Sequence, residues 1–496
     1  MKLAHVAIIG QQHVCYPDKA PFNPPAFYKE TPIQTERDES NFVYDSVRSL
    51  LMLLGYDKAN YGTKDWNPLG WLINPGETVF IKPNMISHKH THNTDWSYVI
   101  THGTVIRAVI DYVFIALKGR GKIVIGDAPQ TDSDFERIIG LMGLKDVQQL
   151  YKDHRQFEIE VIDLRDEYWV EKDGIYVEKV KLPGDPRGGV IVDLARHSMF
   201  TELDGKGKNY YGAFYDTKET NVHHRDGKHE YAISRSPIVA DVFINIPKLK
   251  THKKCGLTVN LKSLVGINAN KNWLPHYTFG SPETGGDQFD RERAKGRIEN
   301  SVVAHAKNLL LQGNPVFKHV ARKAKTIAYQ IFGTNEDVIR SGNWHGNDTV
   351  WRMCLDLNRI LLYANPDGSM RSNGLAKRYF SVVDGMFAME GNGPVAGTMK
   401  KAGILIGGSD PVAVDTVCAK LMGFDYEKIP LLARSFEEHE YTLTRHEAIK
   451  PRSNVTEWDK LLNEWSDDDL LHFQPHFGWA GKIELEPSQS LRRLIG

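Results

Sequence analysis

Cysteine is scarce in this sequence, which has four cysteines among 496 residues. They stand far apart in the chain and form no CxxC pair. This spacing offers no zinc-finger, iron–sulfur or disulfide framework, so we expect no iron–sulfur cluster. Because disulfides are rare in reducing compartments, the composition predicts a cytoplasmic protein. The four cysteines are Cys15, Cys255, Cys354 and Cys418.

Long apolar runs and an excess of charge of one sign are also missing. No stretch approaches the ~18 continuous apolar residues of a membrane-spanning helix, and the apolar run at residues 3–9 is too short for a signal peptide. We therefore predict no transmembrane segment. Lys and Arg together number 62, as do Asp and Glu together. Without a basic excess we expect no nucleic-acid partner.

The sequence does show short strands that alternate with helices. Residues 78–81 form an apolar run, apolar side chains then recur at helical spacing from Val105 to Leu117, and residues 122–126 form the next run. This β-α-β order implies a parallel strand pair with a right-handed crossover. Residues 167–182 alternate in polarity and predict a hairpin. These patterns predict an α/β fold with a mostly parallel sheet core, long inserted loops, a helical insertion and a C-terminal helical cap.

The chain is longer than one typical domain, so we expect several segments. Residues 317–328 combine basic and apolar positions at helical spacing. For this helix we prefer packing on its own domain to contact with an anionic membrane surface. The predicted segments are an N-terminal strand and irregular segment (1–75), a first α/β lobe (76–287), a helical insertion (288–340), a second α/β segment that completes the core (341–435) and a C-terminal cap (436–496).

The stretch 241–282 carries the strongest functional signal. Residues 242–246 read as a buried strand that Pro247 ends, and no Asp or Glu occurs from there to Pro282. In an α/β sheet, residues just past the carboxyl end of a strand face the ligand crevice. A solvated basic loop is the alternative, but asparagine, glycine and tryptophan are mixed in, and we favour a site for a phosphate or carboxylate. The basic residues are Lys248, Lys250, His252, Lys253, Lys254, Lys262, Lys271 and His276.

Polar side chains also follow other predicted strands. Asp127 and Asp384 each stand at a predicted strand end. We assign proton transfer to His252 or to one of the histidines from His88 to His92, with Asp127 or Asp384 either orienting that ring or binding a divalent metal. The predicted substrate-binding residues are Lys82, Asn84, Lys248, Lys250, Asn260, Lys262 and His276.

A histidine-rich loop follows Asn84. His88, His90 and His92 alternate along it, and alternate residues of an extended chain point the same way. Three imidazoles on one face are able to hold a transition metal, which makes a divalent metal the one cofactor that the residues suggest. The favoured alternative is that these rings contact substrate, because the loop follows a strand end.

Five motifs extend over roughly residues 75–425. They are VFIKPNM (79–85), IVIGDAP (123–129), INIPKLKTHKKCGLTVNLKSLVGI (244–267), VVDGMFAMEGNGP (382–394) and GGSDPVAVDTVCAKLMG (407–423). Together they resemble the family called domain of unknown function 362, whose name gives no reaction. The resemblance implies a ferredoxin-like cysteine cluster in many relatives, which this chain lacks.

Two fainter resemblances bear on function. The strand followed by KPN is similar to the lactate-racemase type of enzyme, which uses a nickel-pincer cofactor, and this analogy implies a racemase, isomerase or redox role. Long inserts such as residues 273–287 resemble family versions linked with bacterial polysaccharide or sugar pathways.

We expect an enzyme that acts on an anionic small molecule, such as a sugar or polysaccharide precursor, by acid–base or metal-assisted chemistry. The alternative is a non-catalytic binding protein for an anionic metabolite or glycan. An imidazole within hydrogen-bond reach of a carboxylate inside the lysine-lined cleft would favour the enzyme.

Overall fold

The computed structural model describes residues 3–172, 175–212, 217–291 and 338–486, and a ten-stranded sheet forms its centre. The strands of this sheet are β2 (Val6–Gly10), β3 (Thr78–Pro83), β4 (Lys122–Asp127), β5 (Ile159–Asp163), β12 (Val242–Ile246), β13 (Lys248–His252), β14 (Gly256–Thr258), β16 (Arg378–Glu390), β17 (Thr398–Gly408) and β19 (Arg452–Ser453). Their order is β19-β2-β17-β16-β12-β3-β4-β5, and β13 pairs with β16 and β14. From β16 to β5 all neighbours are parallel, whereas β17 is antiparallel to β16 and β2.

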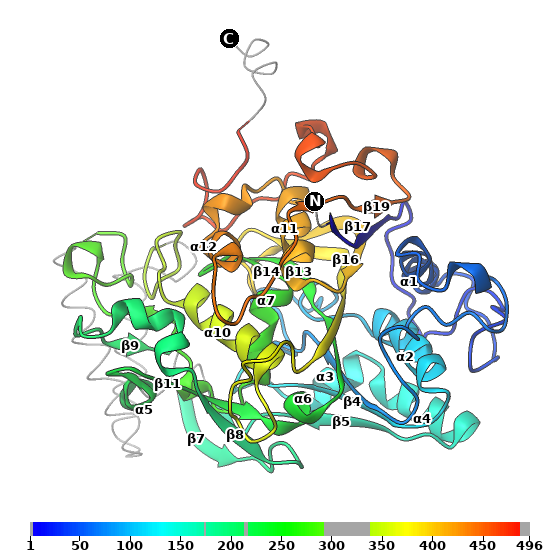
Figure 1. Cartoon of the computed structure of the whole chain (residues 1–496), viewed down its shortest axis with the longest axis horizontal. Helices are drawn as coiled ribbons and strands as arrows, with labels where there is room; N and C mark the ends of the chain where they lie inside the picture. The colour runs from blue at the N-terminus through cyan, green and yellow to red at the C-terminus, as the bar shows by residue number, and fades with distance from the viewer. Residues whose placement is uncertain (1–2, 173–174, 213–216, 292–337, 487–496) are drawn as a thin grey trace, which may run out of the picture.

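Helices cover both faces of the sheet, which confirms the predicted α/β class with a mainly parallel core (Figure 1). One face carries α1 (Phe42–Leu53), α2 (Gly103–Leu117), α3 (Phe135–Leu141) and α4 (Leu144–Arg155), and the other carries α7 (Asn260–Ser263), α10 (Val350–Tyr363) and α11 (Pro411–Leu421). Successive strand residues point to opposite faces. Val79 and Ile81 therefore pack with the α1 and α2 side, while Phe80 packs with the α10 and α11 side.

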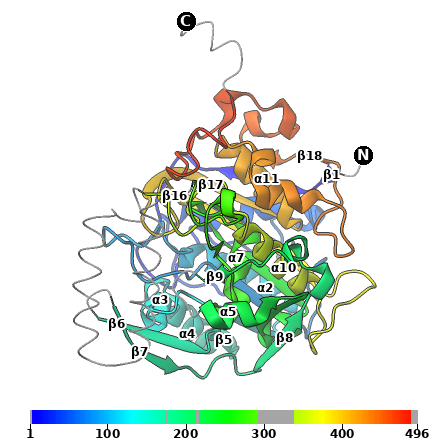
Figure 2. The ribbon, with the colours of Figure 1, turned by 90° about the vertical axis from the view of Figure 1, so that its left-hand side faces the viewer.

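The β-α-β unit and the hairpin both form as predicted. The unit consists of β3, α2 and β4, and the hairpin pairs β6 (Glu167–Lys172) with β7 (Ile175–Lys181). Figure 2 shows this hairpin at the opposite end of the molecule from α11. The remaining elements include β1 (Leu3–Ala4), β8 (Gly189–Asp193), β9 (Tyr210–Tyr211), β10 (His224–Arg225), β11 (Lys228–Ser234), β15 (Tyr277–Thr278), β18 (Ala448–Ile449), α5 (Thr217–His223), α6 (Arg235–Val239) and α12 (Pro430–Ala433).

Two segments near the predicted site differ from the sequence-based expectation. The chain does not become a loop after Pro247: it continues as β13, in which every residue is buried. β13 forms because β16 and β14 supply its backbone partners. Asp384 does not end a strand either, since it lies in the middle of the thirteen-residue β16.

The outer segments agree with expectation only in part. The described part of the C-terminal cap contains short 3-10 turns rather than long helices, and its β19 extends the central sheet beyond β2. Residues 292–337, which include the predicted basic helix at 317–328, lie outside the described residues. None of the described helices is both long and apolar enough to cross a membrane.

Candidate functional site

Lys82 and Asp127 form a buried ion pair where β3 and β4 end. The Lys82 Nζ lies 2.8 Å from the Asp127 Oδ1 and donates to the Ser263 Oγ at 3.1 Å. The Asp127 Oδ2 accepts a hydrogen bond from the backbone N–H of Met85 at 2.8 Å. Burial lowers the pKa of Lys82. The pair thus ties together the ends of β3 and β4 and the helix α7.

Lys248 and Asp384 form a second buried ion pair one strand away. The Lys248 Nζ lies 2.9 Å from the Asp384 Oδ2. The Tyr16 hydroxyl bridges the pair: it donates to the Asp384 Oδ1 at 2.5 Å and accepts from the Lys248 Nζ at 2.7 Å. The backbone N–H of His102 also donates a hydrogen bond to the Asp384 Oδ2, at 2.9 Å. Asp384 is therefore bound to lysine and tyrosine. In the described structure neither Asp384 nor Asp127 bonds to His252, so the orienting role, one of the two that we had offered for these carboxylates, is not seen.

The register of the sheet places the second pair three residues further along the strands than Lys82. Lys82 on β3 is the direct neighbour of Asn245 on β12, and Lys248 follows only three residues later in the chain. Lys250 connects the two pairs electrostatically. Burial lowers the pKa of Lys250 well below its usual value, and the charges of Lys248 and Lys262 lower it further.

Lys250 and Lys271 are buried cations that bond backbone carbonyls. The Lys250 Nζ donates to the carbonyl oxygens of Val99 at 2.9 Å and Pro394 at 3.3 Å. The Lys271 Nζ donates to two carbonyl oxygens of its own loop, at 2.9 and 3.2 Å. Burial lowers the pKa of Lys271 to about 7. Both lysines fix loops around the site. Our sequence analysis counted Lys271 among the basic residues of the predicted anion site but not among the substrate-binding residues.

Lys262 on α7 differs from every other lysine of this group. It is half-buried, and among the residues that the structure describes it has no hydrogen-bond or ion-pair partner. The pKa of each surrounding basic group is lowered mainly by burial. The charge of Lys262 also contributes to this lowering. These groups are Lys82, Lys250, His252, Lys271 and His276. Lys262 therefore stands at the centre of the cluster, which we call the lysine site.

His252 is a neutral hydrogen-bond donor in this arrangement. Its Nδ1 accepts from the backbone N–H of Lys254 at 3.0 Å and lies 3.3 Å from the Cys255 Sγ. An N–H can only donate, so Nδ1 carries no proton and the neutral ring carries it on Nε2. Burial, followed by the Lys262 charge, lowers the pKa of His252 well below its usual value. A role as base would require the other tautomer and the loss of the Lys254 bond.

Three further residues of the predicted site make local contacts. The Asn84 Oδ1 accepts from the backbone N–H of Ile86 at 3.2 Å, within its own turn. The Asn260 Oδ1 accepts from the Tyr379 hydroxyl at 3.0 Å. The His276 Nδ1 lies 2.8 Å from the Leu274 carbonyl oxygen, to which it donates. These contacts position the loops around Lys262.

Asp415 on α11 positions Lys262, and our sequence analysis missed it. Its two carboxylate oxygens accept from the backbone N–H groups of Asn260 and Leu261, each at 2.9 Å. These are the first residues of α7, which carries Lys262. Burial raises the pKa of Asp415 to about 7. Asp415 lies within the motif at 407–423, but no sequence signal linked it to residues 260–262.

The histidine loop does not assemble the proposed metal ligands. The His88 Nδ1 accepts from the backbone N–H of Asp134 at 3.0 Å, while the His90 Nε2 donates to the Gly397 carbonyl oxygen at 2.7 Å. His92 is exposed. Over the described ranges, no group of three or more His, Cys, Asp or Glu side chains is arranged to hold a metal ion. His88 makes its contact apart from the other two, whereas the rings of His90 and His92 meet edge to face and help to line a cavity of about 400 Å³.

The model of a family described as "Domain of unknown function (DUF362)" matches residues 79–235 and 213–420. This chain belongs to the DUF362 family. The matched part contains Lys82, Asp127, Lys248, Lys262 and Asp384, so both ion pairs lie within the DUF362 region. A comparison with curated proteins gives no match. Tyr16 comes from outside the matched residues and still completes the second pair.

Proposed function

We propose that this DUF362 protein binds an anionic small molecule at the lysine site and acts on it as an enzyme. One observation carries the proposal: Lys262 has no counter-ion among the described residues. The carboxylates of Asp127 and Asp384 are already occupied by Lys82 and Lys248. A phosphate or carboxylate group of a ligand would supply the missing negative charge. A sugar phosphate or a sugar acid carries such a group.

Tyr16 is the acid–base group that the geometry favours. Its hydroxyl already donates to the Asp384 Oδ1 at 2.5 Å and accepts from Lys248, so a proton path runs along the three groups. Burial, then the Asp384 charge, raises the pKa of Tyr16 well above its usual value. Tyr16 therefore remains protonated near neutral pH, and in this proposal it relays a proton between Lys248, Asp384 and the bound molecule rather than acting as a strong acid.

A non-catalytic anion-binding protein is the second candidate function. His252 supports it, because this ring has bonds to the Lys254 backbone N–H and to Cys255 and none to a carboxylate in the described part of the chain. In both candidate functions Lys262 binds the anionic group. The two candidates differ only in whether the bound molecule is converted.

Calorimetric titration with inorganic phosphate, citrate and glucose 6-phosphate tests the binding step. At least one of these should bind, and Lys262→Met should weaken it by about tenfold or more, equivalent to about 1.4 kcal/mol. Lys262→Arg retains the charge and should bind better than Lys262→Met. Lys152→Met, at an exposed position of α4, is the matched control and should bind like the wild type. Equal binding by wild type and Lys262→Met would overturn the proposal.

Conversion of the bound molecule is tested by following that molecule by NMR over time. For an enzyme, the wild type converts it, and Tyr16→Phe binds with nearly unchanged affinity but loses turnover. Saturable binding without conversion by the wild type would favour the non-catalytic function.

A further inference from the structure

A second cavity, of about 340 Å³, lies away from the lysine site. Its walls come from the 3-10 turn η3 (Met199–Leu203), from Arg359 on α10 and from residues 437–439. The volume is at the lower end of the range for small-molecule pockets. The cavity is therefore large enough for a compact metabolite.

Arg359 is a buried cation with unfilled hydrogen-bond donors at this cavity. Its side chain is 2% exposed. The Nε donates to the Tyr441 carbonyl oxygen at 3.3 Å, but the Nη1 has no hydrogen-bond partner in the described structure. The carboxylate of Asp356 is 3.8 Å away, too far for a hydrogen bond. A buried donor without a partner costs free energy, so a ligand oxygen at this position would stabilise the protein.

Asp356 is not available to Arg359 because other donors occupy its oxygens. The Oδ2 accepts from the Ser198 hydroxyl at 2.5 Å and from the Tyr231 hydroxyl at 2.9 Å. The Oδ1 accepts from the backbone N–H of Met199 at 2.9 Å. The Nη1 of Arg359 is thus left for a ligand oxygen, and the terminal end of a guanidinium matches a carboxylate.

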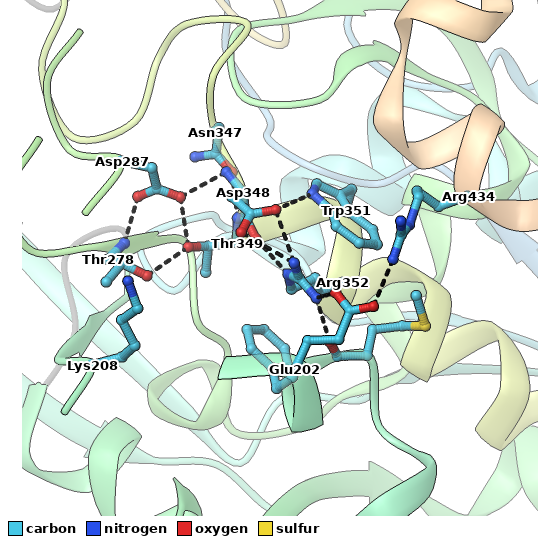
Figure 3. Close-up of polar contacts among 12 residues, drawn as sticks. Glu202, Lys208, Thr278, Asp287, Asn347, Asp348, Thr349, Trp351, Arg352 and Arg434 are labelled. Carbon is cyan, nitrogen blue, oxygen red and sulfur yellow. Dashed lines mark hydrogen bonds and ion pairs between the residues drawn. The ribbon is translucent and has the colours of Figure 1, made fainter. Parts of the chain in front are cut away.

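Two of the three acids at the cavity are already paired, as Figure 3 shows for Glu202. The two Glu202 oxygens accept from Arg352 and Arg434, each at 2.7 Å. The Nη1 of Arg434 also lies 2.9 Å from the Glu437 Oε1. Glu438 is different, because it is exposed and has no hydrogen-bond or ion-pair partner in the described ranges. In the described structure the cavity thus presents one guanidinium with an unfilled donor and one unpaired carboxylate.

We propose that this cavity binds a small zwitterion of the amino-acid class. The ligand carboxylate bonds to Arg359 at the cavity wall, and the ligand ammonium pairs with Glu438 at the rim. A simple anion would leave Glu438 unpaired, and a simple cation would leave the Arg359 donors unfilled. The exposed Arg196, also at the rim, already donates from its Nε to His197 at 3.2 Å. This site uses none of the residues of the lysine site.

Calorimetric titration of the full chain with glycine, alanine, glutamate and arginine tests the proposal, with acetate and ethylamine as half-ligands. We expect saturable binding of at least one amino acid and much weaker binding of both half-ligands. Arg359→Lys keeps the charge but loses the fork, and it should weaken binding by about tenfold. Glu438→Gln, at an exposed position, should weaken binding several-fold without affecting folding.

Glu440→Gln is the matched control, because Glu440 is an exposed acid that pairs with His197 rather than lining the cavity. It should bind like the wild type, as should Lys262→Met, which separates this site from the lysine site. Absence of binding by every amino acid tested would overturn the proposal. Two results would show that the ligand is a simple anion rather than a zwitterion. They are unchanged binding by Glu438→Gln, and binding of acetate as tightly as the amino acid.

Discussion

The Lys82 ammonium and the Asp127 carboxylate lie 2.8 Å apart, and the backbone of Gly266 packs directly against them. A Cβ atom at position 266 would lie 1.7 Å from the Asp127 Oδ1 and 2.8 Å from the Lys82 Nζ. Only glycine therefore fits against this buried ion pair. The close approach links the pair to the loop that follows α7 and Lys262.

Gly266→Ala should destabilise the protein by about 1–3 kcal/mol, because the pair or the loop must move to admit the methyl group. Urea unfolding measures this loss. Gly140→Ala is the matched control: a Cβ there meets nothing within 4 Å, and the site lies in the helix α3, so this change should be neutral or stabilising. Equal stability of Gly266→Ala and wild type would show that the pair does not constrain this position.

Asp384→Ala should cost about 3–5 kcal/mol, since it leaves the Lys248 ammonium buried without a counter-ion. Lys248→Met in the same protein removes that charge and should restore much of the loss. A double-mutant cycle by urea unfolding measures the coupling free energy between the two residues. Additive effects of the two changes would contradict a direct interaction.

Stability should depend on pH through Lys271. Burial lowers the pKa of Lys271 to about 7, so between about pH 7 and about pH 10.4 the unfolded chain binds more protons at this amine than the folded protein does. The free energy of unfolding therefore rises with pH in this window, by up to about 1.4 kcal/mol per pH unit. This contribution is lost as the pH falls through the folded pKa of about 7.

Lys271→Met should remove that part of the pH slope. Urea unfolding of both proteins from about pH 7 to about pH 9 compares the slopes, and the contributions of Asp415 and other groups cancel in the difference. Lys152→Met should keep the slope of the wild type. Parallel curves for wild type and Lys271→Met would show that Lys271 has an ordinary pKa.

His252 should be a neutral ring with its proton on Nε2. The reason is the hydrogen bond that the backbone N–H of Lys254 donates to the Nδ1. Nitrogen-15 NMR of labelled histidine distinguishes the two tautomers, and the ring should stay neutral as the pH falls through about 6.5, the usual histidine pKa. An anion that binds Lys262 should raise this pKa again, because it offsets the lysine charge. Identical titrations with and without the anion would place His252 outside the site.

Local patterns in the sequence predicted much of the fold. The β-α-β unit and the hairpin formed as expected because hydrophobic period and turn position are local properties. The sequence also put Lys82 and Asp127 at the ends of two neighbouring parallel strands, where they form an ion pair, because parallel strands present their carboxyl ends at one edge of a sheet. Family membership was likewise readable from motifs.

Pairing between distant segments decided the rest. Residues 248–252 read as a basic loop, yet they form a buried strand because β16 and β14 supply backbone partners that lie far along the chain or across a turn. Tyr16 reaches Asp384 across 368 positions, and Asp415 reaches the start of α7 across 155. Which lysine side chain of the site lacks any partner depends on all these pairings at once. The sequence therefore determined which charges follow the strands of the sheet, and only the tertiary structure decided that, in the described part of the chain, the Lys262 side chain has neither a hydrogen-bond nor an ion-pair partner.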